Sequence, residues 1–427
     1  MKKILSKRNL ARASVLLVVS VLALTIFVQV AIAALTLKNV KTWCWTNNTD
    51  VSSVVKGDVD VDGKTEIVTG GRYYDGARYV AQLCVWNGAT LALEGVKTWH
   101  WTGDTLITSL AVDEADGDGQ MEIVTGGHYF DGTREVAQLC VWNGATLALE
   151  GVKTWYWTGN THIHSISVGN VDADGGIEIV TGGYYNDGSR NVAQLCVWNG
   201  ATLALENVKT WYWTSNTYIL TVAAGNVDGD AQTEITTGGC YDDGTRGVAQ
   251  LCVWNGATLA LENVKTWHWG AEQSATRVSS VAIGDVDGDA QTEITTGGYY
   301  WYDRNVARLC VWNGATLGLE NFKNWNWSVA DNTVVSSVAV GDADGDTQME
   351  IITGGDRSDI SSDIAQLCVW SGATLGLENV QTWQWTFGTW IKSLVVGNVD
   401  GDAQVEIITG GAYGSTPVNA QLCIWAS

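Results

Sequence analysis

The most constraining feature of this sequence is an acidic nine-residue segment that occurs seven times at a nearly constant interval. The first copy runs from residue 58 to residue 66 and reads DVDVDGKTE. Its last glutamate returns after 56, 56, 56, 59, 57 and 56 residues. Self-similarity at a period of this length is typical of one repeat architecture and argues against a string of unrelated domains.

Each copy places oxygen-bearing side chains at positions one, three, five and nine of the segment. Clustered oxygen donors suit a hard divalent cation, and Ca²⁺ before Mg²⁺, because Ca²⁺ takes about six to eight oxygen ligands. Without a cation these acidic groups would repel one another. The sequence therefore predicts up to seven Ca²⁺ sites. The predicted ligands are Asp58, Asp60, Asp62 and Glu66; Glu114, Asp116, Asp118 and Glu122; Asn170, Asp172, Asp174 and Glu178; Asn226, Asp228, Asp230 and Glu234; Asp285, Asp287, Asp289 and Glu293; Asp342, Asp344, Asp346 and Glu350; and Asn398, Asp400, Asp402 and Glu406.

The charge of the chain is concentrated in these segments. The formal net charge of −22 argues against a nucleic-acid partner, which would require clustered lysine and arginine. Three of the 28 segment positions named above are asparagine. The segments therefore hold 25 of the 46 acidic residues of the chain. With 49 glycines, 23 tryptophans and one proline, the composition favours short strands joined by tight turns.

Each repeat divides into four strand-sized pieces. They cover residues 279–284 in the fifth copy and, in the first, 66–71, 81–86 and 91–101. The Asn87-Gly88 dipeptide and its copies predict a tight hairpin in which both residues have positive φ. Seven units of four antiparallel strands, buried on both faces, predict an all-β fold, a seven-bladed β-propeller. A parallel solenoid, the alternative, would have shorter repeats.

The two ends of the chain predict how the ring closes. The last repeat stops after its third strand, and the missing fourth strand is present at the N-terminus as residues 35–45. Pairing of residues 35–45 with residues 420–425 would complete the seventh blade and leave no free sheet edge.

The acidic segments resemble the loops of the FG-GAP/VCBS repeat family, whose seven-bladed propellers include the head of integrin α chains. The resemblance covers residues 35–427 and implies Ca²⁺ between the first two strands of a blade, at the residues named above. It also implies an extracellular binding or adhesion role. The Thr-Gly-Gly after the second strand also resembles kelch repeats, which share the architecture but lack the acidic loop.

Three features depart from the family loop, D-x-[DN]-x-[DN]-G-x-x-D. The ninth position is always Glu, and the second copy begins with Glu114. The sixth position is glycine in the first three copies only. If this position needs a left-handed backbone, a residue with a Cβ costs about 1–2 kcal/mol there. The Ca²⁺ sites are therefore expected to be strongest in blades one and three. The sixth-position residues are Gly63, Gly119, Gly175, Ala231, Ala290, Thr347 and Ala403.

The N-terminus predicts export. Residues 1–33 comprise a basic leader, a long apolar stretch and an Ala-x-Ala cleavage pattern, as in a signal peptide. The apolar stretch is also long enough for an uncleaved membrane anchor. In either case the domain at residues 35–427 is expected to be secreted or at the cell surface. Seven of the nine cysteines occupy one repeat position, too far apart for disulfides, and are interpreted as small buried residues.

The face opposite the acidic loops is the candidate ligand-binding face. The loops between second and third strands, such as residues 72–78, combine aromatic side chains with an Asp and an Arg, a combination used in sugar or peptide recognition. An internal Asp–Arg lock of the turn is the alternative. The paired tryptophans, such as Trp99 and Trp101, are similar to sugar-binding platforms, but one member of each pair is expected to pack between blades. The candidate ligand-binding residues are Tyr74, Asp75, Arg78, Phe130, Asp131, Arg134, Tyr185, Asp187, Arg190, Asp243 and Arg246.

The sequence contains no recognised catalytic motif. His162 and His164 could supply two metal ligands but lack an evident third, so the pair is interpreted as incidental. The predicted function is a non-catalytic module that binds an extracellular protein or glycan. Two alternatives stay open, a lectin with repeated sugar sites and a polysaccharide-active enzyme.

Overall fold

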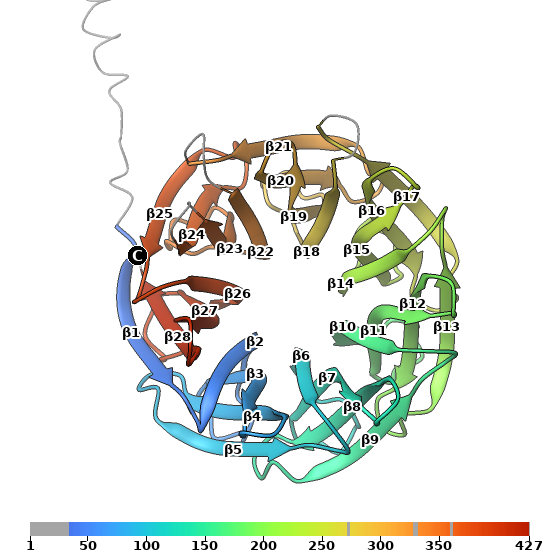
Figure 1. Ribbon diagram of the computed structural model, residues 1–427. Coiled ribbons are helices and arrows are strands. Elements are labelled where there is room, and N and C mark those ends of the chain that lie inside the picture. Colours follow the sequence, from blue (N-terminus) through green and yellow to red (C-terminus); the bar gives the residue numbers. More distant parts are fainter. Residues whose placement is uncertain (1–33, 271–273, 328–331, 359–361, 427) are drawn as a thin grey trace, which may run out of the picture. The chain divides into compact units, whose positions relative to one another are not determined.

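The computed structural model describes residues 34–270, 274–327, 332–358 and 362–426, and the predicted leader at 1–33 lies outside them. These described residues form 28 strands in seven four-stranded antiparallel sheets, arranged as a ring (Figure 1). The predicted seven-bladed β-propeller is thereby confirmed. No helix long and apolar enough to cross a membrane occurs in these ranges.

The first strand of each blade lines the centre of the ring, and the second packs beside it (Figure 1). The first strands are β2 (Asn47–Gly57), β6 (Thr105–Asp113), β10 (Thr161–Gly169), β14 (Thr217–Gly225), β18 (Thr276–Gly284), β22 (Asn332–Gly341) and β26 (Thr389–Gly397). The second strands are β3 (Glu66–Tyr74), β7 (Glu122–Phe130), β11 (Glu178–Asn186), β15 (Glu234–Asp242), β19 (Glu293–Trp301), β23 (Glu350–Ser358) and β27 (Glu406–Tyr413).

The third strands are buried along most of their length, and the fourth strands form the outer rim. The third strands are β4 (Tyr79–Asn87), β8 (Glu135–Asn143), β12 (Asn191–Asn199), β16 (Gly247–Asn255), β20 (Asn305–Asn313), β24 (Asp363–Ser371) and β28 (Asn419–Ala426). The fourth strands are β5 (Leu93–Trp99), β9 (Leu149–Trp155), β13 (Leu205–Trp211), β17 (Leu261–Trp267), β21 (Leu319–Trp325), β25 (Leu377–Trp383) and, from the N-terminus, β1 (Thr36–Trp43).

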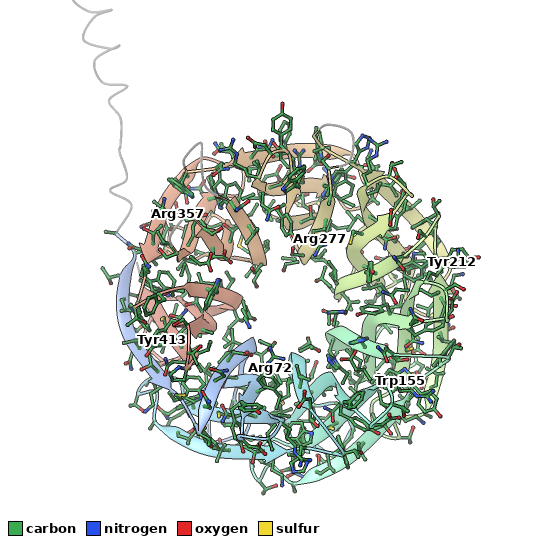
Figure 2. The ribbon with its side chains drawn as sticks, in the orientation of Figure 1. Arg72, Trp155, Tyr212, Arg277, Arg357 and Tyr413 are labelled. Atoms are coloured by element: carbon green, nitrogen blue, oxygen red, sulfur yellow. The ribbon has the colours of Figure 1, made fainter. Side chains whose placement is uncertain are left out.

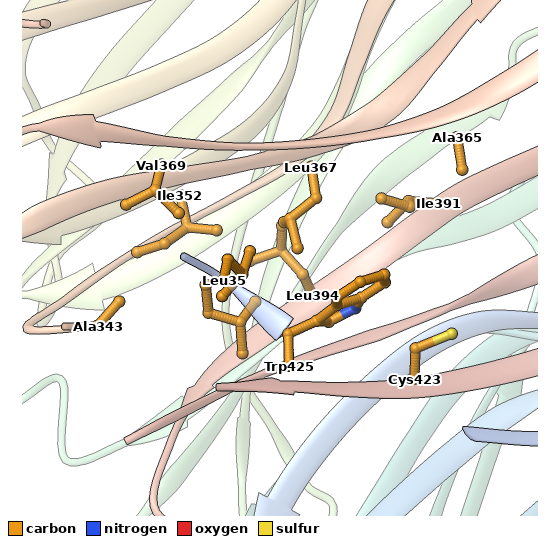
Figure 3. Packing of buried hydrophobic residues seen from close by; sticks show 11 residues of the cluster. Leu35, Ala343, Ile352, Ala365, Leu367, Val369, Ile391, Leu394, Cys423 and Trp425 are labelled. Carbon is orange, nitrogen blue, oxygen red and sulfur yellow. The ribbon is translucent and has the colours of Figure 1, made fainter. Parts of the chain in front are cut away.

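The N-terminal strand closes the ring as predicted. β1 pairs antiparallel with β28, with Leu37 opposite Trp425 and Trp43 opposite Ala420. Just before β1, Leu35 is buried against Leu394 and Trp425, in the core between blades six and seven (Figure 3). The first and last strands of the chain therefore share one sheet.

The hydrophobic core is divided into clusters that lie between neighbouring blades. One cluster joins Val68 and Leu83 of blade one to Ile123, Cys140 and Trp142 of blade two. Cys140 and its six repeat copies are buried and unpaired in the described chain, as the sequence predicts. Because each cluster takes side chains from two sheets, no blade has a complete core of its own.

The predicted hairpin after the third strand has a different geometry. Neither Asn87 nor Gly88 has positive φ, and it is Leu91 that adopts φ 54°. The Asn87 side chain accepts hydrogen bonds from the Thr90 backbone N–H and hydroxyl, so the loop runs from residue 88 to residue 92. Glycine is required at position 88 for another reason. A Cβ there would lie 2.1 Å from the carbonyl oxygen of Val399 in the neighbouring blade.

Several strand limits also differ from the prediction. The second strand extends to Tyr74, because its pairing with β4 continues as far as Tyr74 opposite Tyr79. Only residues 75–78 form the turn, instead of 72–78. The fourth strand covers Leu93–Trp99, not 91–101, and the first strand of blade five begins at Thr276, three residues before the predicted start at 279.

Candidate functional site

The ninth-position glutamate anchors each acidic loop to the body of its blade. Glu66 begins β3 and is 2% exposed, and its Oε2 accepts a hydrogen bond from the backbone N–H of Val59 at 3.0 Å. The apolar side chain of Val59 is itself buried. The same bond recurs in all seven loops, at 2.7–3.0 Å. One oxygen of each glutamate is therefore bonded to the backbone of its own loop, and the other faces the acidic side chains of that loop.

The remaining carboxylates gather around that second oxygen. In blade two, atoms of Glu114, Asp116 and Glu122 lie within 4.8 Å of one another, and groups that include the ninth-position glutamate also occur in blades three and four. Glu122 and Glu178 are fully buried, yet the Oε1 atom of each has no hydrogen-bond partner among the described residues. Burial, followed by repulsion from nearby acidic groups, raises the pKa of Glu122 to about 7. Buried oxygens without donors are what a coordinated cation would satisfy, so the predicted ligands fit Ca²⁺.

A fifth acidic position, missed in the sequence analysis, belongs to the same clusters. In blades one to six the fourth strand carries a glutamate whose charge acts on the ninth-position glutamate of the same blade, as Glu94 does on Glu66. Its presence six times at one repeat position was the available signal. These residues are Glu94, Glu150, Glu206, Glu262, Glu320 and Glu378.

Blade seven replaces this glutamate with Lys38, which lies on β1. The Lys38 ammonium is 2.5 Å from Asp400 Oδ2, 3.0 Å from Asp402 Oδ2 and 3.0 Å from Glu406 Oε1. These contacts hold the pKa of Lys38 well above its usual range. The predicted ligands of the seventh loop are therefore gathered around a cation that the chain itself provides.

The loops hold left-handed residues at the fourth position and, in five of the seven loops, at the sixth position. The fourth position has positive φ in every loop, including at Val61 (61°) and Ala173 (64°), a requirement that the sequence analysis missed. The sixth position is left-handed at its three glycines and also at Ala290 (69°) and Thr347 (75°), as expected. Ala231 and Ala403 do not adopt this conformation.

Among the four loops whose sixth residue has a Cβ, the conformation follows the first residue. Asp285 and Asp342 accept the N–H of the left-handed Ala290 and Thr347, whereas the loops of Ala231 and Ala403 begin with asparagine. In blade one Asp58 has two acceptor oxygens, and Oδ2 accepts the N–H of Gly63 at 2.9 Å. In blade four Asn226 has one acceptor oxygen, and its amide group donates to the carbonyl of Asp230 instead. The same occurs between Asn398 and Asp402 in blade seven. The sixth residue therefore has no carboxylate to bind in these two loops.

On the opposite face, the predicted Asp and Arg residues stabilise turns. Asp75 Oδ1 accepts the backbone N–H groups of Ala77 and Arg78 at 2.7 and 2.8 Å, and these bonds lower the pKa of Asp75. Asp131, Asp187 and Asp243 accept the corresponding bond from their arginines, and Arg246 also pairs with Asp243 at 3.0 Å. These contacts are the turn lock that was left open as the alternative.

The arginines of this face stack on aromatic residues of the loops that join the blades. The guanidinium groups of Arg134 and Arg190 lie 4.3 and 4.4 Å from the rings of Tyr156 and Tyr212, which directly follow the fourth strand of the same blade. Tyr212 lies at the outer rim (Figure 2) and is 49% exposed. The predicted Tyr74 and Tyr185 lie at strand ends and pack on Tyr79 and Trp157, whereas Phe130 is exposed.

The paired tryptophans have two different positions. Trp99 packs on Trp142 of the next blade, with ring centroids 4.7 Å apart, as expected for a residue between blades. Trp101 is 39% exposed, although its Nε1 donates to Gln138. Exposed aromatic side chains recur around this face in the loops that join the blades and at strand ends. They are Trp101, Phe130, Tyr156, Trp157, Tyr212, Trp213, Trp301, Tyr302, Trp327 and Phe387.

A cavity of about 350 Å³ opens on this face between blades four and five. It is lined by Tyr218, Tyr241, Arg246 and Arg277, together with polar groups of the turn at residues 242–247. Aromatic rings beside charged and amide groups suit a polar ligand with a flat apolar face. Of the predicted ligand-binding residues, Arg246 lines this cavity.

Comparison with known proteins supports the architecture. No family model matches the chain, and no curated protein matches it in sequence. Among solved structures, the crystal structure of BBS1N in complex with ARL6DN is similar, with a TM-score of 0.54 and 11% identity. The match covers 92% of this chain and 96% of that chain. At this identity the likeness shows the fold alone.

Proposed function

We propose that the chain is an extracellular, calcium-stabilised β-propeller of the FG-GAP/VCBS type that acts as a non-catalytic binding module. Its ligand would be a protein or a glycan. The β-propeller architecture, which often serves binding, agrees with this role. Secretion and family membership are inferred from the leader and the acidic loops.

The calcium part of the proposal is supported above all by Lys38. At the one loop where the fourth strand offers no glutamate, an ammonium group contacts three carboxylates. In blades one to six a further carboxylate occupies this position, which favours an external cation as the charge that balances the cluster. We therefore propose six Ca²⁺ ions, one in each of blades one to six, and a seventh loop held by Lys38.

The binding part rests on the exposed aromatic side chains of the face opposite the acidic loops. Large exposed aromatic groups on one side of a protein mark interaction surfaces. They lie in the loops that join the blades and at strand ends, and at Tyr156 and Tyr212 an arginine stacks on the ring. Such a face presents flat apolar rings beside fixed charges, which suits sugars and peptide side chains alike.

A glycan array probed with and without EDTA tests this proposal. Saturable glycan binding that is lost in Trp157→Ala and Tyr212→Ala would identify the aromatic face as a glycan site. Thr90→Ala, on the opposite face, is the control. Capture of a defined extracellular protein with the same variant profile would identify a protein ligand. Turnover of a polysaccharide would contradict the non-catalytic role.

A further inference from the structure

Two imidazoles and one carboxylate meet at the junction of blades two and three, on the face opposite the acidic loops. They are His128 on β7, Glu135 on β8 and His162 on β10, and one ligand atom of each lies within 4.8 Å of the other two. His162 Nε2 is 2.8 Å from Glu135 Oε2. The ring centroids of His128 and His162 are 4.4 Å apart. We propose that this cluster is a binding site for Zn²⁺ or another transition-metal ion that prefers imidazole.

The fold brings to His162 two ligands that the sequence did not predict, whereas His164, its predicted partner, lies outside the cluster. His128 is opposite Ala137 in the sheet, and Phe130 is opposite Glu135. Directly opposed residues share a face of the sheet, and so do residues two apart on one strand. His128 and Glu135 therefore both face blade three, where β10 presents His162.

The cluster is buried but retains an opening to solvent. His162 is 8% exposed, and the Nδ1 atom of His128 is buried with no hydrogen-bond partner among the described residues. The Glu135 side chain is 37% exposed and provides a path for an ion. Burial lowers the pKa of His128 to about 4 and that of His162 to about 3. Both rings are therefore neutral near pH 7, the form that binds metal.

The ligand set matches zinc chemistry. Two imidazoles and one carboxylate, with a further position left for water, is a common arrangement for Zn²⁺. Imidazole ligands favour Zn²⁺, Cu²⁺ and Ni²⁺ over Ca²⁺ and Mg²⁺. Zn–N bonds of about 2.0–2.1 Å require the ligand atoms, which lie within 4.8 Å of one another, to converge by rotation of their side chains when the ion binds.

Neighbouring side chains hold His162 in place and balance the local charge. Tyr184 stacks on His162 at 4.6 Å and on His164 at 5.4 Å. Arg72 acts electrostatically on His128 and would oppose a cation, but Arg72 is ion-paired with Asp50 at 3.2 Å. His164 is parallel to His162 at 6.2 Å and lies outside the three-residue cluster.

The combination is unlike the other junctions of the ring. Among the described blades, no other junction has two imidazoles and a carboxylate at these three repeat positions, so symmetry is broken where the cluster lies. The other six sets are Arg72, Tyr79 and Leu106; Tyr184, Asn191 and Tyr218; Cys240, Gly247 and Arg277; Tyr299, Asn305 and Val334; Asp356, Asp363 and Trp390; and Ala412, Asn419 and Asp50.

Zinc titration of the full chain in saturating Ca²⁺ tests this proposal, since Ca²⁺ keeps Zn²⁺ out of the acidic loops. Competition with a chromogenic chelator is expected to show one Zn²⁺ per chain. Co²⁺ should give the visible absorption of an imidazole-bound ion. His128→Gln combined with His162→Gln, and Glu135→Gln alone, should each weaken Zn²⁺ binding by about tenfold or more. His100→Gln combined with His268→Gln, at two exposed histidines, is the matched control.

Two results would overturn the proposal. One is an absence of saturable Zn²⁺ binding to the wild-type chain, and the other is equal affinity in the wild type and Glu135→Gln. Glu135 is half-exposed at the start of a strand, so that variant is expected to fold even if the double histidine variant does not. Melting of the same variants with and without Ca²⁺ reports on the acidic loops separately. The zinc site and the calcium proposal can therefore fail independently.

Discussion

At position 38 the repeat carries a lysine where its six copies carry a glutamate, and this exchange changes the charge balance of a loop 364 residues away. The contact joins β1 to the acidic loop before β27, within the sheet that closes the ring. Lys38 departs from the repeat in the sequence, but only the fold shows that it lies beside Asp402.

We expect Lys38→Glu to convert the seventh loop into a metal-dependent one. The variant would bring a further carboxylate to Asp400, Asp402 and Glu406, so it should melt at a lower temperature in EDTA than the wild type. Calorimetric titration should show one more Ca²⁺ per chain. Thr42→Glu, which adds the same charge to an exposed position of β1, should leave the number of bound ions unchanged. An identical ion count in Lys38→Glu and wild type would contradict the assignment.

The carboxyl group of Asp356 predicts a pH dependence of folding stability that is separate from any effect of the acidic loops. In the folded chain burial, and then the charge of Asp363, raises the pKa of Asp356 from its ordinary value of 3.8 to about 7. Between these values the folded state binds a proton that the unfolded state lacks. Stability is therefore lost as pH rises from about 4 to about 7.

Asp356→Asn should remove this loss. In saturating Ca²⁺, urea unfolding is expected to show a smaller drop in the free energy of unfolding between pH 5 and pH 8 for the variant than for the wild type. Equal drops in both proteins would show that Asp356 does not carry a raised pKa.

At the scale of the elements, β1 closes the ring by pairing with β28. A chain that begins at residue 46 would lose the partner of β28 and the buried side chain of Leu35. We expect it to melt at a lower temperature and to self-associate through the exposed edge of β28. A synthetic peptide of residues 34–45 should restore both properties, and a scrambled peptide should not. An unchanged melting temperature and a monomeric state after truncation would argue against this role of β1.

The sequence predicted these elements well where a repeated pattern determines them. The period, the acidic loops and the missing fourth strand were sufficient to predict the blades and their closure. The hairpin at Asn87 was predicted with the wrong geometry, because what requires Gly88 is the carbonyl of Val399 in the neighbouring blade seven. The grouping of His128 and Glu135 with His162 was missed for the same reason, since a repeat pattern does not show which residues meet across blades.

At the scale of the whole molecule, the proposed ions are distributed around the ring. Removal of Ca²⁺ should therefore lower the melting temperature of the whole domain, and the temperature should rise with the logarithm of the Ca²⁺ concentration above the dissociation constant. Asp60→Asn should remove one bound ion, whereas Asp400→Asn should remove none, because Lys38 lies in that loop. Equal loss of ions in both variants, or melting that does not respond to chelation, would contradict six independent sites.

The pairing of β1 with β28 also has a consequence for how the chain is made. The strand Thr36–Trp43 is synthesised early, yet the strand that pairs with it is completed only about 380 residues later. During that interval its backbone groups have no sheet to join. The charges of Lys38 and Lys41 on this short strand suit such a delay, since lysines discourage premature pairing with other chains. Lys38, which balances the charge of the seventh loop in the folded chain, can thus first limit the association of β1 with other chains until β28 has been synthesised.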